Sequence, residues 1–319
     1  MIDRPRRTTP IDKALALLDN HFGPTEVRSS LSLLEQCEAF CAALEAKEPE
    51  PVRMLHHFAC TGGTVIAKCI AAVPNTVLLS EIDPLSTLQT GEKAKRFAPT
   101  DLILNLRNSL RSVNDETIET VFADGFLAMY KSLTLEGRRL VIREHTHSHF
   151  CTKVDPAGRP SVHDLIARIV PVLSVVTVRH PLDSFLSLQA NRWIHFSPST
   201  LEEYSRRYLA FLTAYEKVRV IRYEDFVADV EHTLQEMCDI FKLPHNPYFL
   251  ELLPIISISG DSGRSSNIIE PRSRREIPEA VAEQVLSSPS YFRLCQDLGY
   301  EPSPTNFERG RVSDQGRAN

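Results

Sequence analysis

The stretch VVTVRHPLDSFLSL, residues 175–188, decides which fold we expect for this chain. A run of β-branched residues ends at Arg179, Pro181 follows, and apolar residues then recur at helical spacing up to Leu188. This pattern predicts a buried parallel strand, a tight turn and a helix that packs on the sheet. Ligands of open α/β sheets bind at the carboxyl ends of the strands, which is where Arg179 stands.

Two side chains of this unit, Arg179 and Ser187, are candidate anion ligands. A guanidinium binds an anion through two parallel donors. Ser187 lies about two helical turns further along, where it can add a hydroxyl. The alternative is structural: Arg179 pairs with Asp183, and Ser187 is an ordinary helical serine. On this stretch alone the two interpretations have equal weight.

A second candidate anion site lies between an expected strand at 52–58 and an expected helix at 64–73. The connecting ACTGG contains Gly62 and Gly63, which allow a tight turn with N–H groups directed inward. The N-terminus of the following helix adds amides and a partial positive charge, and Thr64 can add its hydroxyl. The Gly-Lys-Ser/Thr ending of a Walker A loop is absent. A glycine-rich connection without a ligand is the alternative.

Together with RYEDF at 222–226, these two segments resemble the sulfotransferase family, from about residue 52 to the C-terminus. Members of that family transfer a sulfuryl group from 3'-phosphoadenosine 5'-phosphosulfate (PAPS) and release PAP. The resemblance implies that Arg179 and Ser187 bind the 3'-phosphate, and that a late basic segment containing Arg264, with Arg272 behind it, closes over that phosphate. The residues it assigns to the 5'-phosphosulfate loop are Cys60, Thr61, Gly62, Gly63, Thr64 and Val65.

The loop departs from the family pattern at one position. Many sulfotransferases carry Lys or Arg there, on the bridging oxygen of the donor, whereas this chain has Thr61. Lys68 lies one turn into the following helix, and we expect it to point away. Arg143 is our candidate for the replacing cation, since it ends an expected strand at 138–143 and begins a segment that loosely resembles the Lys-Thr-His segment of cytosolic sulfotransferases. A loop with Thr61 and no such cation favours a noncatalytic nucleotide-binding module.

The acceptor must also lose a proton to a base, and two groups of residues compete for that role. Glu81 and Asp83 lie just beyond an expected strand at 75–80, a place that resembles the catalytic Glu site of carbohydrate sulfotransferases. His145 and His147 lie where cytosolic sulfotransferases carry their His. We rank Glu81 slightly ahead of His145, with Asp83 and His147 behind. A structural role stays open for each.

The histidines of REHTHSHF, residues 143–150, have one further interpretation. Alternate residues of an extended segment point the same way, so His145, His147 and His149 would share a face. Because the sequence shows no firm carboxylate partner, a metal site is the lesser alternative, and we expect no metal.

Of four other residues or segments, three are assigned mainly structural roles and the fourth, Trp193, is left open. His56 and His57 lie inside the first strand and are expected to be core histidines. Tyr223-Glu224-Asp225 follows the last strand, where Asp225 can cap a helix. Trp193 either lines the ligand pocket or fills core.

The organisation along the chain predicts an α/β fold with a mostly parallel central sheet flanked by helices, of the P-loop-like sulfotransferase type. Further strands are expected at 172–179 and 217–222, and an insertion at 84–136 is expected to be helical and to shape the substrate pocket. Ser199 or Thr200 resembles a helix start, and 278–298 predicts one or two helices. The expected parts are a helical extension at 1–50, the α/β domain at 51–302 and a flexible tail at 303–319.

Composition narrows the class of protein. The chain has 319 residues, 42% hydrophobic, which suffices for one large α/β domain or two small ones. A net charge of −5 argues against general nucleic-acid affinity. Seven cysteines without a CxxC pair argue against a disulfide framework and favour a reducing compartment. With no signal core and no membrane-spanning run, we expect a soluble, cytoplasmic protein without a membrane partner.

The sequence therefore favours a PAPS-dependent sulfotransferase acting on a hydroxyl or amine. A P-loop-type kinase or nucleotide hydrolase using ATP or GTP is the main rival, with Asp83 as a magnesium ligand. A noncatalytic nucleotide-binding module is the third hypothesis. Small-molecule, glycan and lipid acceptors stay open, as does a peptide, and the oligomeric state is not predicted.

Overall fold

The computed structural model describes residues 48–88, 99–259 and 268–302, together with Ser32, Leu34, Glu35 and Glu38. The chain divides into a unit of Met1–Glu48 and a unit of Pro49–Asn319, and the fold and site below belong to the second unit. Most of the extension expected at 1–50, the tail expected at 303–319 and Arg264 lie outside the described residues.

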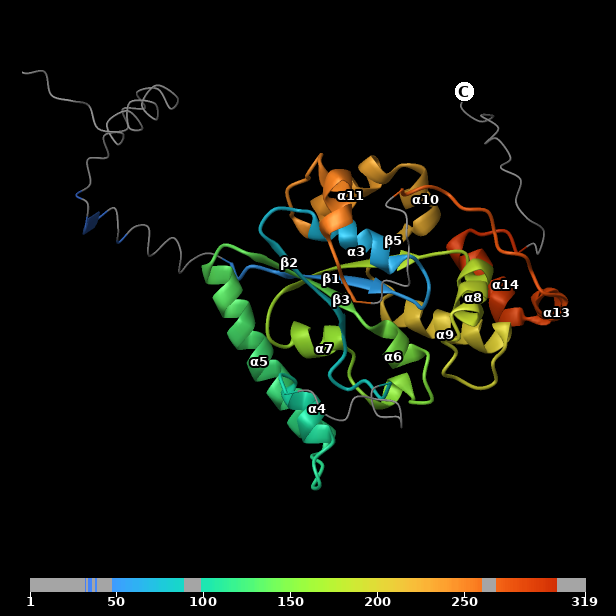
Figure 1. Ribbon diagram of the computed structural model, residues 1–319, viewed down its shortest axis with the longest axis horizontal. Coiled ribbons are helices and arrows are strands. Elements are labelled where there is room, and N and C mark those ends of the chain that lie inside the picture. Colours follow the sequence, from blue (N-terminus) through green and yellow to red (C-terminus); the bar gives the residue numbers. More distant parts are fainter. Residues whose placement is uncertain are drawn as a thin grey trace, which may run out of the picture. The chain divides into compact units, whose positions relative to one another are not determined.

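Five parallel strands form the sheet of the described part, in the order β2-β3-β1-β4-β5 (Figure 1). The expected strands are all confirmed, with ends that shift by no more than two residues. The strands are β1 (Val52–His57), β2 (Thr76–Ile82), β3 (Arg139–Glu144), β4 (Val172–Val178) and β5 (Arg219–Arg222).

Helices cover both faces of this sheet, as Figure 1 shows. Neighbouring strand residues face opposite cores: Leu55 packs in the core that holds α3, α10 and α11, while Met54 packs in the core that holds α5 and α7. Strand β4 alternates in the same way, since Val175 faces α11 and Val176 faces α8 and α9. The helices are α3 (Gly63–Ala71), α4 (Leu102–Arg107), α5 (Asp115–Leu135), α6 (Thr146–Phe150), α7 (Val162–Ala167), α8 (Pro181–Ala190), α9 (Leu201–Ala214), α10 (Tyr223–Ala228), α11 (Val230–Phe241), α12 (Phe249–Leu252), α13 (Glu279–Ser287) and α14 (Pro289–Leu298).

Several local predictions are confirmed. Helix α3 begins at the second residue of the double glycine, and α4 and α5 lie in the insertion expected at 84–136. Helix α9 begins where expected, because the Thr200 side chain accepts a hydrogen bond from the Glu203 N–H at 3.3 Å. The segment expected at 278–298 forms two helices, α13 and α14.

Two local predictions are wrong. The three histidines of 143–150 do not share an extended segment, because β3 ends at Glu144 and α6 follows almost at once. Helical geometry turns successive side chains around the axis, so alternate residues no longer face the same way. Asp225 does not cap α10: the helix begins at Tyr223 with Arg222 as its N-cap, which places Asp225 in the first turn.

Candidate functional site

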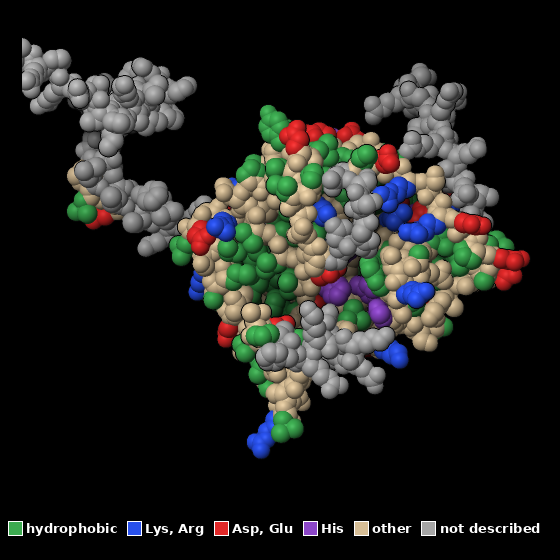
Figure 2. All heavy atoms as spheres, viewed as in Figure 1, with side chains coloured by type: hydrophobic (Ala, Val, Ile, Leu, Met, Phe, Trp, Pro, Cys, Tyr) green, Lys and Arg blue, Asp and Glu red, His purple; other side chains and the backbone are tan. Residues whose placement is uncertain are grey.

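The carboxyl ends of all five strands meet at a cavity of 480 Å³. Residues at or directly after the strand ends line it, in sheet order Glu81, Arg143, His57, Arg179 and Tyr223. On the face shown in Figure 2, histidine side chains gather in a hollow with hydrophobic side chains beside them. The sequence-predicted residues that line the cavity are Cys60, Thr61, Gly62, Gly63, Thr64, Val65, Glu81, Arg143, His145, His147, Arg179 and Ser187.

The glycine loop is shaped by contacts that exclude any side chain. Gly62 has φ 87°, and a Cβ added there would lie 2.2 Å from the ring of Tyr223. A Cβ added at Gly63 would lie 2.4 Å from the ring of His57. Between them these rings seat the start of α3 against the cavity, where backbone amides and the helix dipole favour an anion. The Thr61 hydroxyl is used inside the loop, since it donates to the Phe58 carbonyl at 2.8 Å.

The pairing of Arg179 with Asp183 is not found among the described residues. Asp183, its suggested partner, instead accepts a hydrogen bond from Arg274 Nε at 2.7 Å. Arg179 lies over the ring of Tyr223 at 5.1 Å, and its Nη1 is 3.5 Å from the Cys60 carbonyl oxygen. The guanidinium is therefore positioned beside the glycine loop without a carboxylate from its own helix.

The turn that carries Arg179 is held by distant parts of the chain. The Arg179 N–H donates to the Tyr208 hydroxyl at 3.1 Å. Glu224 accepts from the His180 N–H at 3.0 Å and from the Tyr300 hydroxyl at 2.6 Å. Glu224 thus has the structural role expected for the segment after the last strand.

On the other side of the glycine loop, Arg143 is the central cation. It is 4% exposed, and its Nη1 donates to Ser80 Oγ at 2.8 Å and to the Ser259 carbonyl at 2.9 Å. Its Nη2 lies 3.2 Å from His57 Nε2 and 3.3 Å from Glu81 Oε1. Burial, together with the charge of Arg143, lowers the pKa of His57 well below its ordinary value, so this ring is neutral and can accept from Arg143.

Glu81 reaches Arg143 because of an irregularity in β2. Ser80 pairs with Arg143 and Ile82 pairs with Glu144, so Glu81 is the extra residue of a β-bulge. Its φ is 61°, in the left-handed region that favours glycine. Bulges re-aim side chains and are common beside active sites, and backbone strain in a side-chain-bearing residue is maintained only where its surroundings enforce it.

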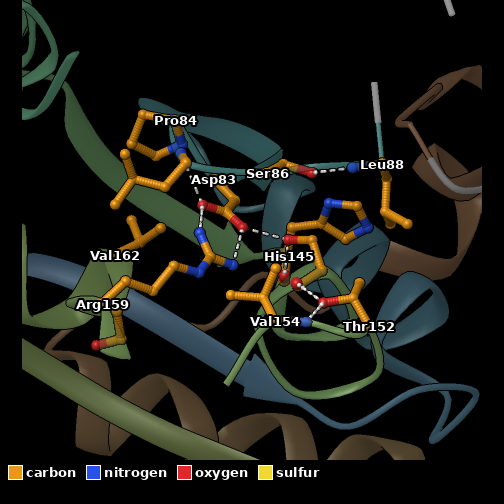
Figure 3. Close-up of polar contacts among 12 residues, drawn as sticks. Asp83, Pro84, Ser86, Leu88, His145, Thr152, Val154, Arg159 and Val162 are labelled. Carbon is orange, nitrogen blue, oxygen red and sulfur yellow. Dashed lines mark hydrogen bonds and ion pairs between the residues drawn. The ribbon is translucent and has the colours of Figure 1, made fainter. Parts of the chain in front are cut away.

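Asp83, two residues further, faces a different environment (Figure 3). Arg159 holds both of its carboxylate oxygens, at 2.9 and 2.8 Å, and Ser148 donates to one of them. Burial alone would raise the pKa of Asp83, but the hydrogen bonds and charge of Arg159 outweigh it and lower the pKa. Among the described residues that line the 480 Å³ cavity, Asp83 is not included.

His145 and His147 both line the cavity, whereas His149 does not. Burial lowers the pKa of His145, against the opposing effect of Glu81. Burial and the neighbouring His145 lower the pKa of His147 to about 3, and a hydrogen bond to the Trp193 backbone only partly offsets this. Both rings are therefore neutral at ordinary pH. The described residues contain no cluster of His, Cys, Asp or Glu that could hold a metal ion.

Several lining residues were not assigned to the site from the sequence. His57 is buried, as expected of a core histidine, and it also supports Gly63 and contacts Arg143. Lys68 lines the cavity, so the expectation that it points away is wrong. Arg275 also lines it, as does Arg272. The only signal for these residues in the sequence was their closeness to motifs; Arg264 itself lies outside the described residues.

A solved structure shares this overall arrangement of strands and helices. The chain is similar to the sulfotransferase domain of an olefin synthase from Synechococcus PCC 7002, with 18% identity and a TM-score of 0.52, over 81% of this chain and 97% of that one. The chain has the sulfotransferase fold. The expected fold class is thereby confirmed. Of the described helices, none is both long and apolar enough to cross a membrane.

Two further similarities to proteins with the sulfotransferase fold are weaker. A sulfotransferase from Alicyclobacillus acidocaldarius has 14% identity and a TM-score of 0.41, over 79% of this chain and 97% of that one. A sulfotransferase from Mycobacterium tuberculosis H37Rv has 16% identity and a TM-score of 0.37, over 71% and 77%. No protein-family model matches the sequence, and no curated protein matches it significantly.

Proposed function

We propose that this protein transfers a sulfuryl group from PAPS to the hydroxyl or amine of an acceptor and releases PAP. The observation that supports this most directly is one continuous cavity with a phosphate-type glycine loop in its middle. Arg179 and Ser187 lie on one side of that loop, and Arg143 with Glu81 lies on the other.

The residues present fit this donor. Strand β1, which carries the glycine loop, lies between β4 and β3. Neighbouring strands are about 4.8 Å apart, so the sheet edge from β4 to β2 spans roughly 14 Å, about the length of one extended nucleotide. Arg179 and Ser187 would hold the 3'-phosphate, and the amides of Gly63 and Thr64 would hold the 5'-phosphosulfate. The basic side chains lining the cavity are Lys68, Arg143, Arg179, Arg272 and Arg275.

When bound, PAPS supplies the transferred group: the acceptor atom bonds to sulfur, the bond from sulfur to the bridging oxygen of the 5'-phosphate breaks, and the electron pair stays on PAP. Arg143 is placed to stabilise negative charge at that bridge, because Ser80 and His57 fix its guanidinium before any ligand arrives. Arg143 thus replaces the cation missing from the loop at Thr61.

Glu81 is our first choice for the group that takes the acceptor proton, and His145 is the second. The bulge presents the Glu81 carboxylate next to Arg143, on the β2 side of the glycine loop. His145 is a neutral imidazole in the same cavity and can also accept a proton. In either case the proton passes from the acceptor to a side chain already in place.

The magnesium-dependent alternative is disfavoured by the contacts of Asp83. A kinase or nucleotide hydrolase would use a strand-end carboxylate to hold the metal. Arg159 binds both oxygens of Asp83 instead, and Ser148 donates to one of them. The noncatalytic alternative rested on the absence of a loop cation, and Arg143 supplies that cation from β3.

The direct test is a titration with PAP, ATP and GTP, each with magnesium and with a chelator. Trp193, the single tryptophan, lines the cavity, so its fluorescence reports binding alongside calorimetry. We expect PAP to bind equally well with and without magnesium, and labelled PAPS to donate its sulfuryl group to an acceptor. Absence of PAP binding together with tight, magnesium-dependent ATP binding would overturn the proposal. PAP binding without any release or transfer of sulfate would support the noncatalytic module.

A further inference from the structure

A second cavity, of 280 Å³, lies beside the first, between the end of β2 and helices α4 and α5. Glu81 lines both cavities. In Figure 1, α4 and α5 lie together along one side of the sheet. The second cavity therefore opens next to the carboxylate that we propose as the base. Its apolar lining consists of Ile82, Pro84, Ile103, Leu104 and Phe122.

Most polar groups around this second cavity are already occupied. Asp83 is held by Arg159, as described above. Asp101 accepts from the Leu104 N–H at 2.9 Å and caps α4. The Nη2 of Arg107 donates to the Pro84 carbonyl at 3.1 Å and lies 3.3 Å from an Asp115 carboxylate oxygen. Among the described side chains that line the cavity, Arg107 Nε is the buried polar atom without a hydrogen-bond partner.

We propose that this cavity binds the apolar body of the acceptor, and that the acceptor is a small aromatic or short aliphatic alcohol. The inference rests on the proposed function, because it places the acceptor hydroxyl at Glu81. A volume of 280 Å³ is just below the usual range for ligand pockets, so the cavity suits one or two rings or a short chain.

The same contacts argue against a sugar as the occupant. A pyranose carries several hydroxyls, and each one that is buried without a partner costs free energy. Arg159 binds both oxygens of the Asp83 carboxylate and one oxygen of Asp101 caps α4, which leaves few acceptor atoms for such hydroxyls. A second polar atom of the ligand has one candidate donor in this lining, Arg107 Nε, which lacks a partner among the described residues.

The experiment measures binding of 2-naphthol by calorimetry, with and without saturating PAP, to the full chain. Leu104→Trp and Ile103→Trp place a large ring in the cavity. Leu110→Trp is the matched control, because Leu110 follows the same helix and is fully exposed. We expect the wild type and the control to bind 2-naphthol equally and both cavity variants to bind it at least tenfold more weakly. N-acetylglucosamine should not compete.

Either of two results would overturn the inference: unchanged 2-naphthol affinity in both folded cavity variants, or competition by N-acetylglucosamine at similar concentration. The PAP titration on the same samples keeps the two proposals separate. If the wild-type protein does not bind PAP, the proposed function is contradicted. If it binds PAP but not 2-naphthol, only the acceptor assignment is contradicted. If 2-naphthol is also an acceptor, Leu104→Trp should raise its KM far more than it lowers kcat.

Discussion

Replacing Arg179 by Ala should weaken PAP binding strongly while leaving the fold nearly intact. Among the described residues this guanidinium has only modest interactions, a carbonyl at 3.5 Å and the Tyr223 ring at 5.1 Å. A cation–π contact of this kind is worth about 0.5–1 kcal/mol at a partly exposed site, and Asp183 is paired with Arg274 instead. The free energy of unfolding should therefore fall by no more than about 1 kcal/mol.

The effect on the ligand should be larger, because a partly desolvated phosphate loses its charged partner. We expect a loss of ~2–4 kcal/mol, which raises the Kd for PAP roughly 30- to 800-fold. Ser187→Ala removes a neutral donor and should cost on the order of 1 kcal/mol, or about fivefold in Kd. The ordering of the two variants follows from charge alone.

The assay is a PAP titration by calorimetry or Trp193 fluorescence, with urea denaturation to establish that each variant is folded. Arg206→Ala is the control, since it removes one positive charge from an exposed position on α9. If Arg179→Ala is folded and binds PAP with unchanged affinity, the 3'-phosphate does not lie at the end of β4 and the site must be reassigned.

Further variants test the base, the pair of Asp83 and Arg159, and the buried His180. Glu81→Gln or His145→Ala should reduce turnover ~100-fold or more at retained PAP affinity, marking the base; normal rates in both would direct the search to the insertion between β2 and β3. Asp83→Asn should destabilise the fold by roughly 3 kcal/mol in urea denaturation, because it leaves the buried charge of Arg159 without its counter-ion; a stable variant that only loses turnover would contradict this structural role. Burial, with a smaller contribution from a nearby arginine, lowers the pKa of His180 to about 4. The unfolded chain therefore binds the proton more readily, and stability should fall as pH drops from about 7 to about 4.5, by roughly 2 kcal/mol from this group; an equal pH dependence in His180→Gln would refute the assignment.

The strands and the helices that follow them could be predicted from the sequence because the patterns that indicate them are local. β-branched runs, the double glycine and helical spacing each lie within a few turns of chain, and they placed all five strands to within two residues. Because the carboxyl ends of parallel strands share one edge, the same patterns placed Gly62, Arg179 and Ser187 around one cavity.

Other features required partners that the local pattern does not specify. Asp83 pairs with Arg159, 76 residues away, and Asp183 pairs with Arg274, 91 residues away. The chain has 36 lysines and arginines, and nothing in their spacing indicates which of them reaches a given carboxylate.

Short segments of the sequence are enough to predict the sheet, the glycine turn and the strand-end Arg179, since each follows from local periodicity and turn chemistry. Glu81 and Asp83 are two residues apart in the chain, and their different roles became visible in the folded structure. A bulge turns the Glu81 carboxylate toward Arg143, while Asp83 is buried against Arg159. The physical reason is that a carboxylate's role depends on which charge and how much solvent it faces, and packing between distant segments decides both.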